Sequence, residues 1–175
     1  MSESVNAALE PTSVNAITLS VNGVPYPVAL ANDRNLSGVL RQECGLTGTK
    51  EGCDDCECGA CMVLLDGQPI NSCSYLAVQC QGREVTTVEG LANGQELHPL
   101  QRNILATAGV QCGFCTPGML MSAHALLERN ADPTLEEIRI GLSGNLCRCT
   151  GYARILEAVQ ATANETPVTL PTSET

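Results

Sequence analysis

The chain has 175 residues and a mass of 18.4 kDa, which is enough for one medium domain or two small ones. Its formal net charge is −10, and only 2% of its residues are aromatic. The acidity argues against nucleic acid or an anionic membrane as a partner, and the scarcity of aromatic rings argues against a base-stacking platform. The core must therefore be built from aliphatic side chains.

The N-terminal part of the chain predicts a β-hairpin after a polar segment. Residues 1–14 show no periodicity and are expected to be a mobile tail. Apolar and polar residues then alternate over 16–22, and 24–30 follows a turn at Asn22-Gly23. Because Asn-Gly readily adopts the positive φ angles of a tight turn, the two segments are predicted to pair.

A short helix, a long loop and two further strands are predicted next. Asn35 is expected to cap the helix and Gly45 to end it. Residues 47–61 are rich in Gly and Cys and are predicted to form a loop, with short strands at 62–66 and 84–88. Together with the hairpin, these segments predict an α+β unit in which one helix packs on a small mixed sheet.

After residue 89 the apolar pattern changes to the period of a helix. Pro99 and Pro117 mark two helix starts, because proline is well tolerated in the first turn. Thr134 and Glu137 have the spacing of a capping box. Four helices are therefore predicted, over residues 98–108, from 116, from 134 and over 152–162.

These elements divide the chain into two domains. Residues 15–89 form the α+β part, and residues 90–162 are predicted to be a compact helical domain. Residues 163–175 are rich in Thr and Pro and are expected to be a second mobile tail. No stretch is long and apolar enough to predict a membrane span.

The eleven cysteines carry most of the chemical information. Met1 to Asn15 has no basic start and no apolar stretch, so no secretory segment is predicted and a cytoplasmic protein is expected. Thiols stay reduced in that compartment, and clustered reduced thiols favour a metal site. The two histidines, His98 and His124, are remote in sequence from the cysteines, which argues against a Cys/His zinc finger and a Rieske centre.

The first cysteine set has the spacing C-x4-C-x2-C, and eleven residues separate its third cysteine from the fourth. This is the plant-type [2Fe–2S] spacing. Two irons bridged by two sulfides require four thiolates on a loop that folds closely around them, and the glycines of this loop leave room for that approach. The predicted ligands are Cys53, Cys58, Cys61 and Cys73.

The second cysteine set combines C-x2-C at a helix start with C-x-C between two helices. C-x-C is too tight for most zinc ribbons, so a second [2Fe–2S] centre accounts for it better. The predicted ligands are Cys112, Cys115, Cys147 and Cys149. Of the three remaining cysteines, Cys44 and Cys80 are expected to be small buried hydrophobic residues.

Three runs of residues around these cysteines form a recognisable series. The first is GLTGTKEGC over 45–53 with CGAC over 58–61, the second is QCGFCTPG over 111–118, and the third is GNLCRCTGY over 144–152. In this order they resemble the iron–sulfur subunit of the xanthine oxidase family of molybdenum hydroxylases. The resemblance covers residues 15–162.

The resemblance implies a fold and a cofactor arrangement. Residues 15–89 would be a plant-ferredoxin-like β-grasp domain and residues 90–162 a four-helix domain, each with one [2Fe–2S] cluster. The cluster of the helical domain would lie nearer a molybdopterin held by a separate large subunit, with Gln111 and Cys149 touching that cofactor. The other cluster would be the outer one, nearer FAD or solvent.

The function implied is electron transfer within an oxidoreductase complex. No nucleophile–base pair, Rossmann glycine pattern or P-loop is present in the sequence, so no catalytic residue is assigned. Electrons would pass one at a time from the molybdopterin centre to FAD or another acceptor, while the complex oxidises an N-heteroaromatic, an aldehyde or a related substrate. The implied partners are a large molybdopterin-binding subunit and an FAD-binding medium subunit, with a dimer of heterotrimers as one form of the assembly.

Several alternatives stay open from the sequence. Cys56 departs from the family pattern, and it is either an inert loop thiol or a ligand in place of Cys53 or Cys58. Structural zinc is the alternative for the loop cysteines. Without the resemblance, Gln111 would be interpreted as a helix-start residue bonded to the backbone. The alternative function is a freestanding ferredoxin-like carrier, but such a shuttle would need only residues 15–89.

Overall fold

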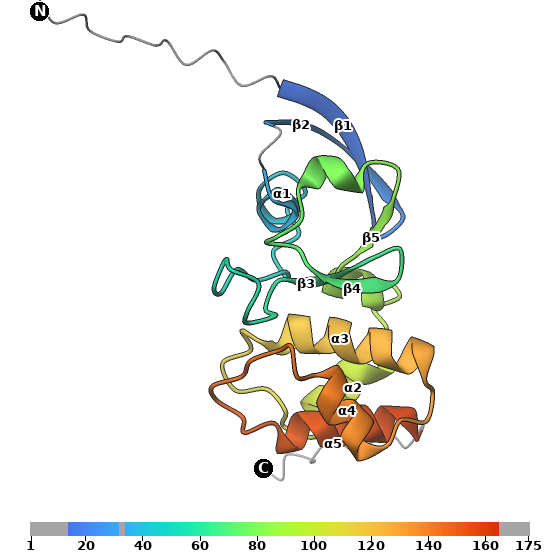
Figure 1. Cartoon of the computed structure of the whole chain (residues 1–175). Coiled ribbons are helices and arrows are strands. Elements are labelled where there is room, and N and C mark those ends of the chain that lie inside the picture. The colour runs from blue at the N-terminus through green and yellow to red at the C-terminus, as the bar shows by residue number, and fades with distance from the viewer. Residues whose placement is uncertain (1–13, 32–33, 165–175) are drawn as a thin grey trace, which may run out of the picture.

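The computed structural model describes residues 14–31 and 34–164 (Figure 1). A five-stranded sheet with one helix forms one part, and four further helices pack below it in the view of Figure 1. The tail predicted over 1–14 lies outside the described residues except for Val14, which begins a strand. The tail predicted over 163–175 also lies outside them, except for Ala163 and Asn164, which end the last helix.

The sheet is mixed and has the strand order β2-β1-β5-β3-β4. Strands β1 and β5 are parallel, and the other neighbouring pairs are antiparallel. The predicted hairpin is present, with Asn22 and Gly23 at φ angles of 53° and 72°. The sequence prediction missed β4, a four-residue strand without a clear alternating pattern. The strands are β1 (Val14–Val21), β2 (Val24–Ala31), β3 (Met62–Leu65), β4 (Gln68–Asn71) and β5 (Glu84–Thr86).

Helix α1 (Leu36–Gln42) packs against the sheet through aliphatic side chains, as predicted. The side chain of Asn35 accepts a hydrogen bond from the N–H of Gly38 at 2.9 Å and so caps the helix. Buried Leu, Val and Ile side chains from α1 and four of the strands form one hydrophobic core. Cys80, in the short 3-10 helix η1 (Ala77–Cys80), is buried in this core as predicted, and Cys44 packs against its edge. A second 3-10 helix, η2 (Val88–Leu91), leads to the helical part.

The helical part has its own core of aliphatic side chains. The predicted capping box is confirmed, because Thr134 and Glu137 exchange side-chain-to-backbone hydrogen bonds at 3.2 and 2.7 Å. All four predicted helices are present, with ends that differ by one or two residues. They are α2 (Pro99–Ala106), α3 (Thr116–Arg129), α4 (Leu135–Gly141) and α5 (Ala153–Ala163).

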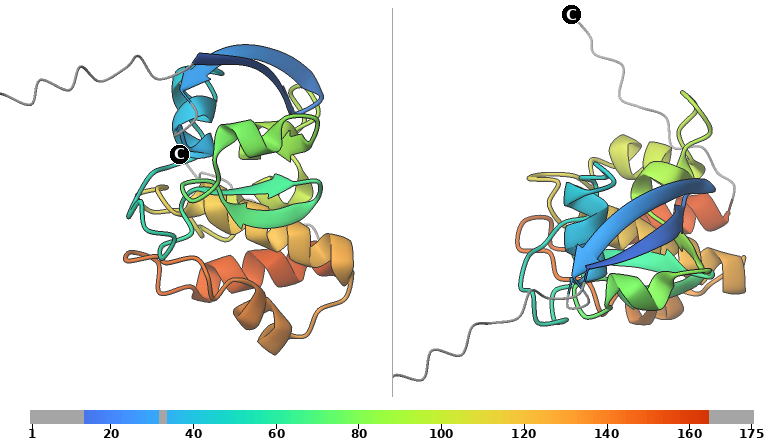
Figure 2. Two further views of the ribbon diagram at one scale, coloured as in Figure 1. Left: turned by 45° about the horizontal axis from the view of Figure 1, so that its top comes forward. Right: turned by 90° about the horizontal axis from the view of Figure 1, so that it is seen from above.

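Helix α3 joins the two parts of the molecule. It lies beneath β3 and β4, with the other helices on its far side (Figures 1 and 2). Met121 and Ala125 of α3 pack against Leu64 of β3, while Leu120 and Leu126 belong to the helical core. The α+β class predicted from the sequence is therefore confirmed as a mixed sheet and five α-helices packed into one body.

Candidate metal centres

The two cysteine sets lie on the same side of the molecule, at the left of Figures 1 and 2. The long loop between α1 and β3 carries three members of the first set, and Cys73 follows β4. The loop between α2 and α3 carries Cys112 and Cys115, whereas Cys147 and Cys149 lie between α4 and α5. Residues separated by more than half of the chain thus face one region.

The first set is arranged as two pairs of thiols. The Cys58 N–H donates to Cys53 Sγ at 3.3 Å, and these two cysteines form the first pair. The thiols of Cys61 and Cys73 form the second pair. Burial, reinforced by the contact with Cys61, raises the pKa of Cys73 to about 12.

Cys56 lies beside the second of these pairs. Its Sγ is 3.9 Å from Cys73 Sγ. The sequence had left open that Cys56 replaces Cys53 or Cys58, but the structure places it against Cys73. The loop turns back at Cys56, whose φ angle of 69° directs the chain toward the end of β4.

The second set also consists of two pairs. The Sγ atoms of Cys112 and Cys149 are 3.5 Å apart, and both side chains are exposed. The thiols of Cys115 and Cys147 form the inner pair, with Cys115 buried at the start of α3. Burial, followed by the contact with Cys147, raises the pKa of Cys115 to about 12. One pair therefore faces solvent and the other faces the helical core.

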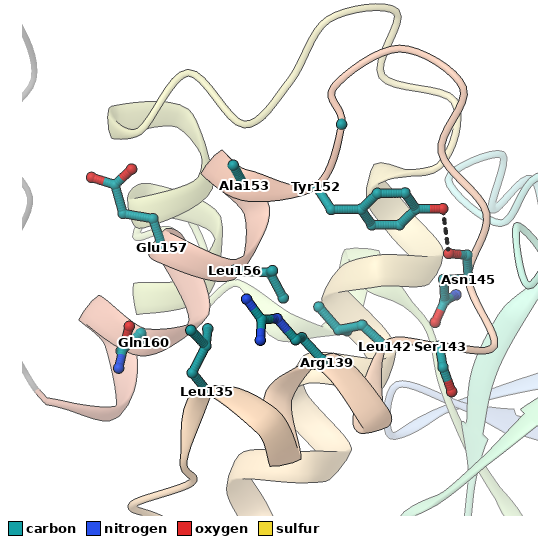
Figure 3. Close-up of a pocket in the computed structure, with 11 residues that line it drawn as sticks. Leu135, Arg139, Leu142, Ser143, Asn145, Tyr152, Ala153, Leu156, Glu157 and Gln160 are labelled. Carbon is teal, nitrogen blue, oxygen red and sulfur yellow. Dashed lines mark hydrogen bonds between the residues drawn. The ribbon is translucent and has the colours of Figure 1, made fainter.

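The loop around Cys147 is fixed by its neighbours. Burial raises the pKa of Cys147, but hydrogen bonds from the Thr150 hydroxyl and N–H, at 3.1 and 3.4 Å, outweigh it and bring the pKa to about 7. The Tyr152 hydroxyl accepts from the Cys147 N–H at 2.8 Å and donates to the Asn145 carbonyl at 3.3 Å, as Figure 3 shows for the latter bond. The two hydrogen bonds from Thr150 to the sulfur favour a thiolate at Cys147 in the folded chain.

A cavity of about 650 Å³ adjoins this loop between α4 and α5 (Figure 3). Its lining combines apolar side chains such as Leu142 and Leu156 with Arg139 and Glu157, and it includes no thiol. The candidate metal centres are therefore the exposed cysteine loops and not this cavity.

The pairing of the thiols bears on the kind of metal centre that they could form. Within residues 14–31 and 34–164, no three His, Cys, Asp or Glu side chains converge as a single metal ion would require. A structural zinc ion needs four convergent ligands, whereas each iron of an all-cysteine [2Fe–2S] cluster takes two thiolates. The paired thiols therefore match the two thiolates that each iron of an all-cysteine [2Fe–2S] cluster takes.

The two cysteine loops are connected directly through their backbones. The Leu146 N–H donates to the Cys58 carbonyl at 2.9 Å, and the Asn145 side chain donates to the Gly59 carbonyl at 2.9 Å. Ser122 of α3 donates to Asn145 Oδ1 at 2.6 Å. The sequence interpretation missed the role of Asn145, whose only signal was its place inside the GNLCRCTGY run.

Two glycines allow this close approach. A Cβ atom at Gly118 would lie 2.2 Å from the Gly59 carbonyl oxygen, and one at Gly59 would lie 2.2 Å from the Gly144 carbonyl oxygen. Neither distance is tolerable for a real side chain. The loops can therefore touch only because these positions carry no side chain.

Gln111 lies on the exposed side of the second set. It directly precedes Cys112, and both side chains are exposed. Phe114 and Leu146 are 46% and 57% exposed, so each of the two loops presents a large apolar side chain to solvent. The two histidines pack on one another, with ring centroids 5.2 Å apart, and not on a cysteine loop. No described helix is long and apolar enough to cross a membrane.

Comparisons with known proteins agree on one kind of relative. Residues 87–160 match the model of a [2Fe-2S] binding domain. The chain is 46% identical over 144 residues to the nicotinate dehydrogenase small FeS subunit of Eubacterium barkeri, covering 82% of this chain and 92% of that one. It is also 46% identical over 145 residues to the xanthine dehydrogenase iron-sulfur-binding subunit of Escherichia coli O157:H7, covering 82% and 91%. Among solved structures, quinoline 2-oxidoreductase from Pseudomonas putida 86 contains a chain with a TM-score of 0.84 and 43% identity, over 87% of this chain and 96% of that one.

Proposed function

This chain belongs to the small iron–sulfur subunits of the xanthine oxidase family of molybdenum hydroxylases, and we propose from this premise how it transfers electrons. The resemblance predicted from three sequence motifs is thereby confirmed. The chain is a non-catalytic electron-transfer subunit of an oxidoreductase complex. It conducts electrons one at a time from a molybdopterin centre on a large subunit toward FAD or another acceptor.

The eight predicted cysteines are the proposed ligands of the two clusters. The support is the division of each set into two thiol pairs, which matches two irons with two thiolates each. When bound, each cluster accepts and releases a single electron, so two in series can divide the electron pair of a substrate oxidation. The outer cluster is assigned to Cys53, Cys58, Cys61 and Cys73, and the inner cluster to Cys112, Cys115, Cys147 and Cys149.

The contact between the loops gives this chain a short connection between its two ligand sets. Cys58 is a proposed outer ligand, and its carbonyl accepts the N–H of Leu146, the residue before the proposed inner ligand Cys147. One hydrogen bond and a few covalent bonds therefore separate the two sets. Asn145 holds the connection by bonding Gly59 on one side and Ser122 on the other.

The exposed side of the inner set is the proposed docking face for the large subunit. Cys112 and Cys149 face solvent there, and the exposed Phe114 and Leu146 provide apolar area of the kind buried at the centre of an interface. Gln111 and Cys149 are proposed to contact the molybdopterin, because both are exposed on this face. No residue of this chain is proposed to contact the substrate.

The finer architecture and the assembly belong to the same proposal. Residues 15–89 are proposed to be a plant-ferredoxin-like β-grasp domain and residues 90–162 a four-helix domain, supported by two separate hydrophobic cores. A medium FAD-binding subunit, a dimer of heterotrimers and a cytoplasmic location are proposed from family membership. The substrate class, an N-heteroaromatic, aldehyde or related compound, is proposed on the same ground.

Purification of the complex through a tag on this chain, under low oxygen, tests the proposal. The complex is expected to contain iron and acid-labile sulfide in equal amounts, together with molybdenum and FAD. Substitution of both Phe114 and Leu146 by Ser should release the molybdenum-bearing partner while this chain keeps its iron. Loss of iron together with the partner would contradict the docking assignment, and iron without any molybdenum-bearing partner would favour the freestanding carrier.

A further inference from the structure

Five thiols, one more than a [2Fe–2S] cluster needs, lie in or beside the first cysteine set. The additional one is Cys56, and its side chain is exposed. Its backbone has a φ angle of 69°, a left-handed conformation that residues other than glycine seldom adopt. The chain therefore places a cysteine at a position where the backbone favours glycine, and the position of its sulfur explains what this cysteine can do.

The sulfur of Cys56 lies beside the sulfur of Cys73. It lies 3.9 Å from Cys73 Sγ. Among the described residues, no hydrogen bond joins the sulfur of Cys56 to the sulfur of Cys53 or Cys58.

Asn71, at the end of β4, holds Cys56 in this place. Its side-chain N–H donates to the Cys56 carbonyl at 3.0 Å. Its Oδ1 accepts a hydrogen bond from the thiol of Cys61 at 3.9 Å. A single side chain thus ties the backbone of Cys56 to Cys61, the thiol that pairs with Cys73.

We propose that Cys56 is a reserve ligand of the outer cluster, which replaces Cys73 on the iron that Cys73 shares with Cys61. The proposal rests on the outer ligand set assigned above. In the exchange, the iron–sulfur bond to Cys73 breaks and one to Cys56 forms. The proton released by the Cys56 thiol is balanced by the proton that the departing Cys73 thiolate takes up, and no electron moves.

Four variants of the full chain test this assignment: C73A, C56A, the double variant C56A/C73A, and C58A. Each is purified under low oxygen and assayed for iron and acid-labile sulfide per chain, and for the electron paramagnetic resonance signals after reduction. C56A is expected to keep the wild-type iron content. C73A is expected to keep it as well, with a changed outer-cluster signal, whereas C56A/C73A and C58A should lose about half of the iron.

The outcomes separate this proposal from the ligand assignment beneath it. Loss of the outer signal in C73A, to the same extent as in C58A, would overturn the reserve role and leave the ligand set intact. Retention of the outer signal in C58A would contradict the ligand set itself. Loss in C56A alone would make Cys56 a primary ligand, and retention in C56A/C73A would show that neither thiol is needed. The inner-cluster signal in each sample reports that the chain has folded.

Asn71 provides a further control for geometry. In the C73A background, N71A should reduce the retained outer-cluster iron by at least half, because Cys56 loses the bond that positions it. In the wild-type background, N71A should leave the iron content unchanged. Equal retention in C73A and C73A/N71A would contradict the positioning by Asn71.

Discussion

The two cysteine sets are built by different means. The outer set lies largely on one loop, whose course is set by the left-handed residues Asp54 and Cys56, and only Cys73 comes from beyond the following hairpin. The inner set is assembled from two loops that helices α3 and α5 hold in place, and Cys115 is buried at the start of α3. The outer set thus depends mainly on local backbone conformation, whereas the inner set depends on the packing of the helical core.

This difference has consequences for tolerance to change. A loop that is exposed over residues 54–57 can rearrange there at small cost, and it can carry a fifth thiol near its ligands. A buried thiol at a helix start cannot move without disturbing the core behind it. We therefore expect substitutions at the inner set to be the less forgiving ones.

The largest effect is expected for C115A. Cys115 is the buried member of the inner set, and no other cysteine lies among the residues of the helical core except its partner Cys147. The inner cluster should be lost with about half of the iron, while the outer signal persists. Iron analysis and electron paramagnetic resonance of the reduced chain measure this, with C44A as the matched control. An unchanged pair of signals in C115A would refute the inner assignment.

The next effect concerns the junction between the two sets. G118A places a methyl group where only 2.2 Å separates it from the Gly59 carbonyl oxygen, so the loops must move apart. We expect a loss of about 2–3 kcal/mol in the free energy of unfolding. Denaturant titration of the iron-loaded chain under low oxygen measures the loss.

G144A is the control for the junction. A Cβ atom at Gly144 meets nothing within 4 Å, so the free energy of unfolding should change by no more than about 0.5 kcal/mol. Equal losses in the free energy of unfolding for G118A and G144A would mean that the close approach of the loops does not explain the effect of G118A.

A smaller effect, confined to one set, is expected for Y152F. The variant removes the hydroxyl that accepts from the Cys147 N–H and donates to the Asn145 carbonyl. Loss of this bridge should cost about 1 kcal/mol and alter the inner-cluster signal, while the outer signal stays the same. Thermal unfolding and the resonance spectrum of the reduced chain test both parts. A change in the outer signal alone would argue against the placement of Tyr152 in the inner loop.

The smallest expected effect is a dependence of stability on pH that arises in the helical part. His98 Nδ1 accepts the N–H of Leu100, so the helix cap requires the neutral ring. Burial, followed by the charges of His124 and Arg102, lowers the pKa of His98. A lowered pKa in the folded state contributes stability that is present above the unfolded value of about 6.5 and is lost as the pH falls below it.

The H98N variant isolates this dependence. Asn also caps helices but does not titrate, so the loss of stability between pH 7 and pH 5 should be smaller in H98N than in the wild type. The difference should stay below about 1 kcal/mol, because the half-buried site is screened by solvent. Identical pH profiles of the melting temperature would rule out His98 as the titrating group.

Much of this molecule could be predicted because the responsible interactions are local. The Asn22-Gly23 turn, the Asn35 cap and the Thr134–Glu137 capping box each depend on residues within a few positions of one another, and all three form as predicted. The two ligand sets are predicted from the same kind of local pattern, the spacing of cysteines along the chain. Short-range interactions of this kind follow directly from the order of the residues in the chain.

Contacts between distant residues decided the rest. Sequence periodicity identified one apolar face of α3, but the second face, with Met121 and Ala125, becomes apparent only when β3 covers it. Asn145 bonds Gly59 across 86 positions, and Cys56 meets Cys73 only because β3 and β4 fold back between them. The residue types determined that the chain binds iron–sulfur clusters, while the folded chain decided which sulfur lies beside which, since a local pattern holds no information about distances across the fold.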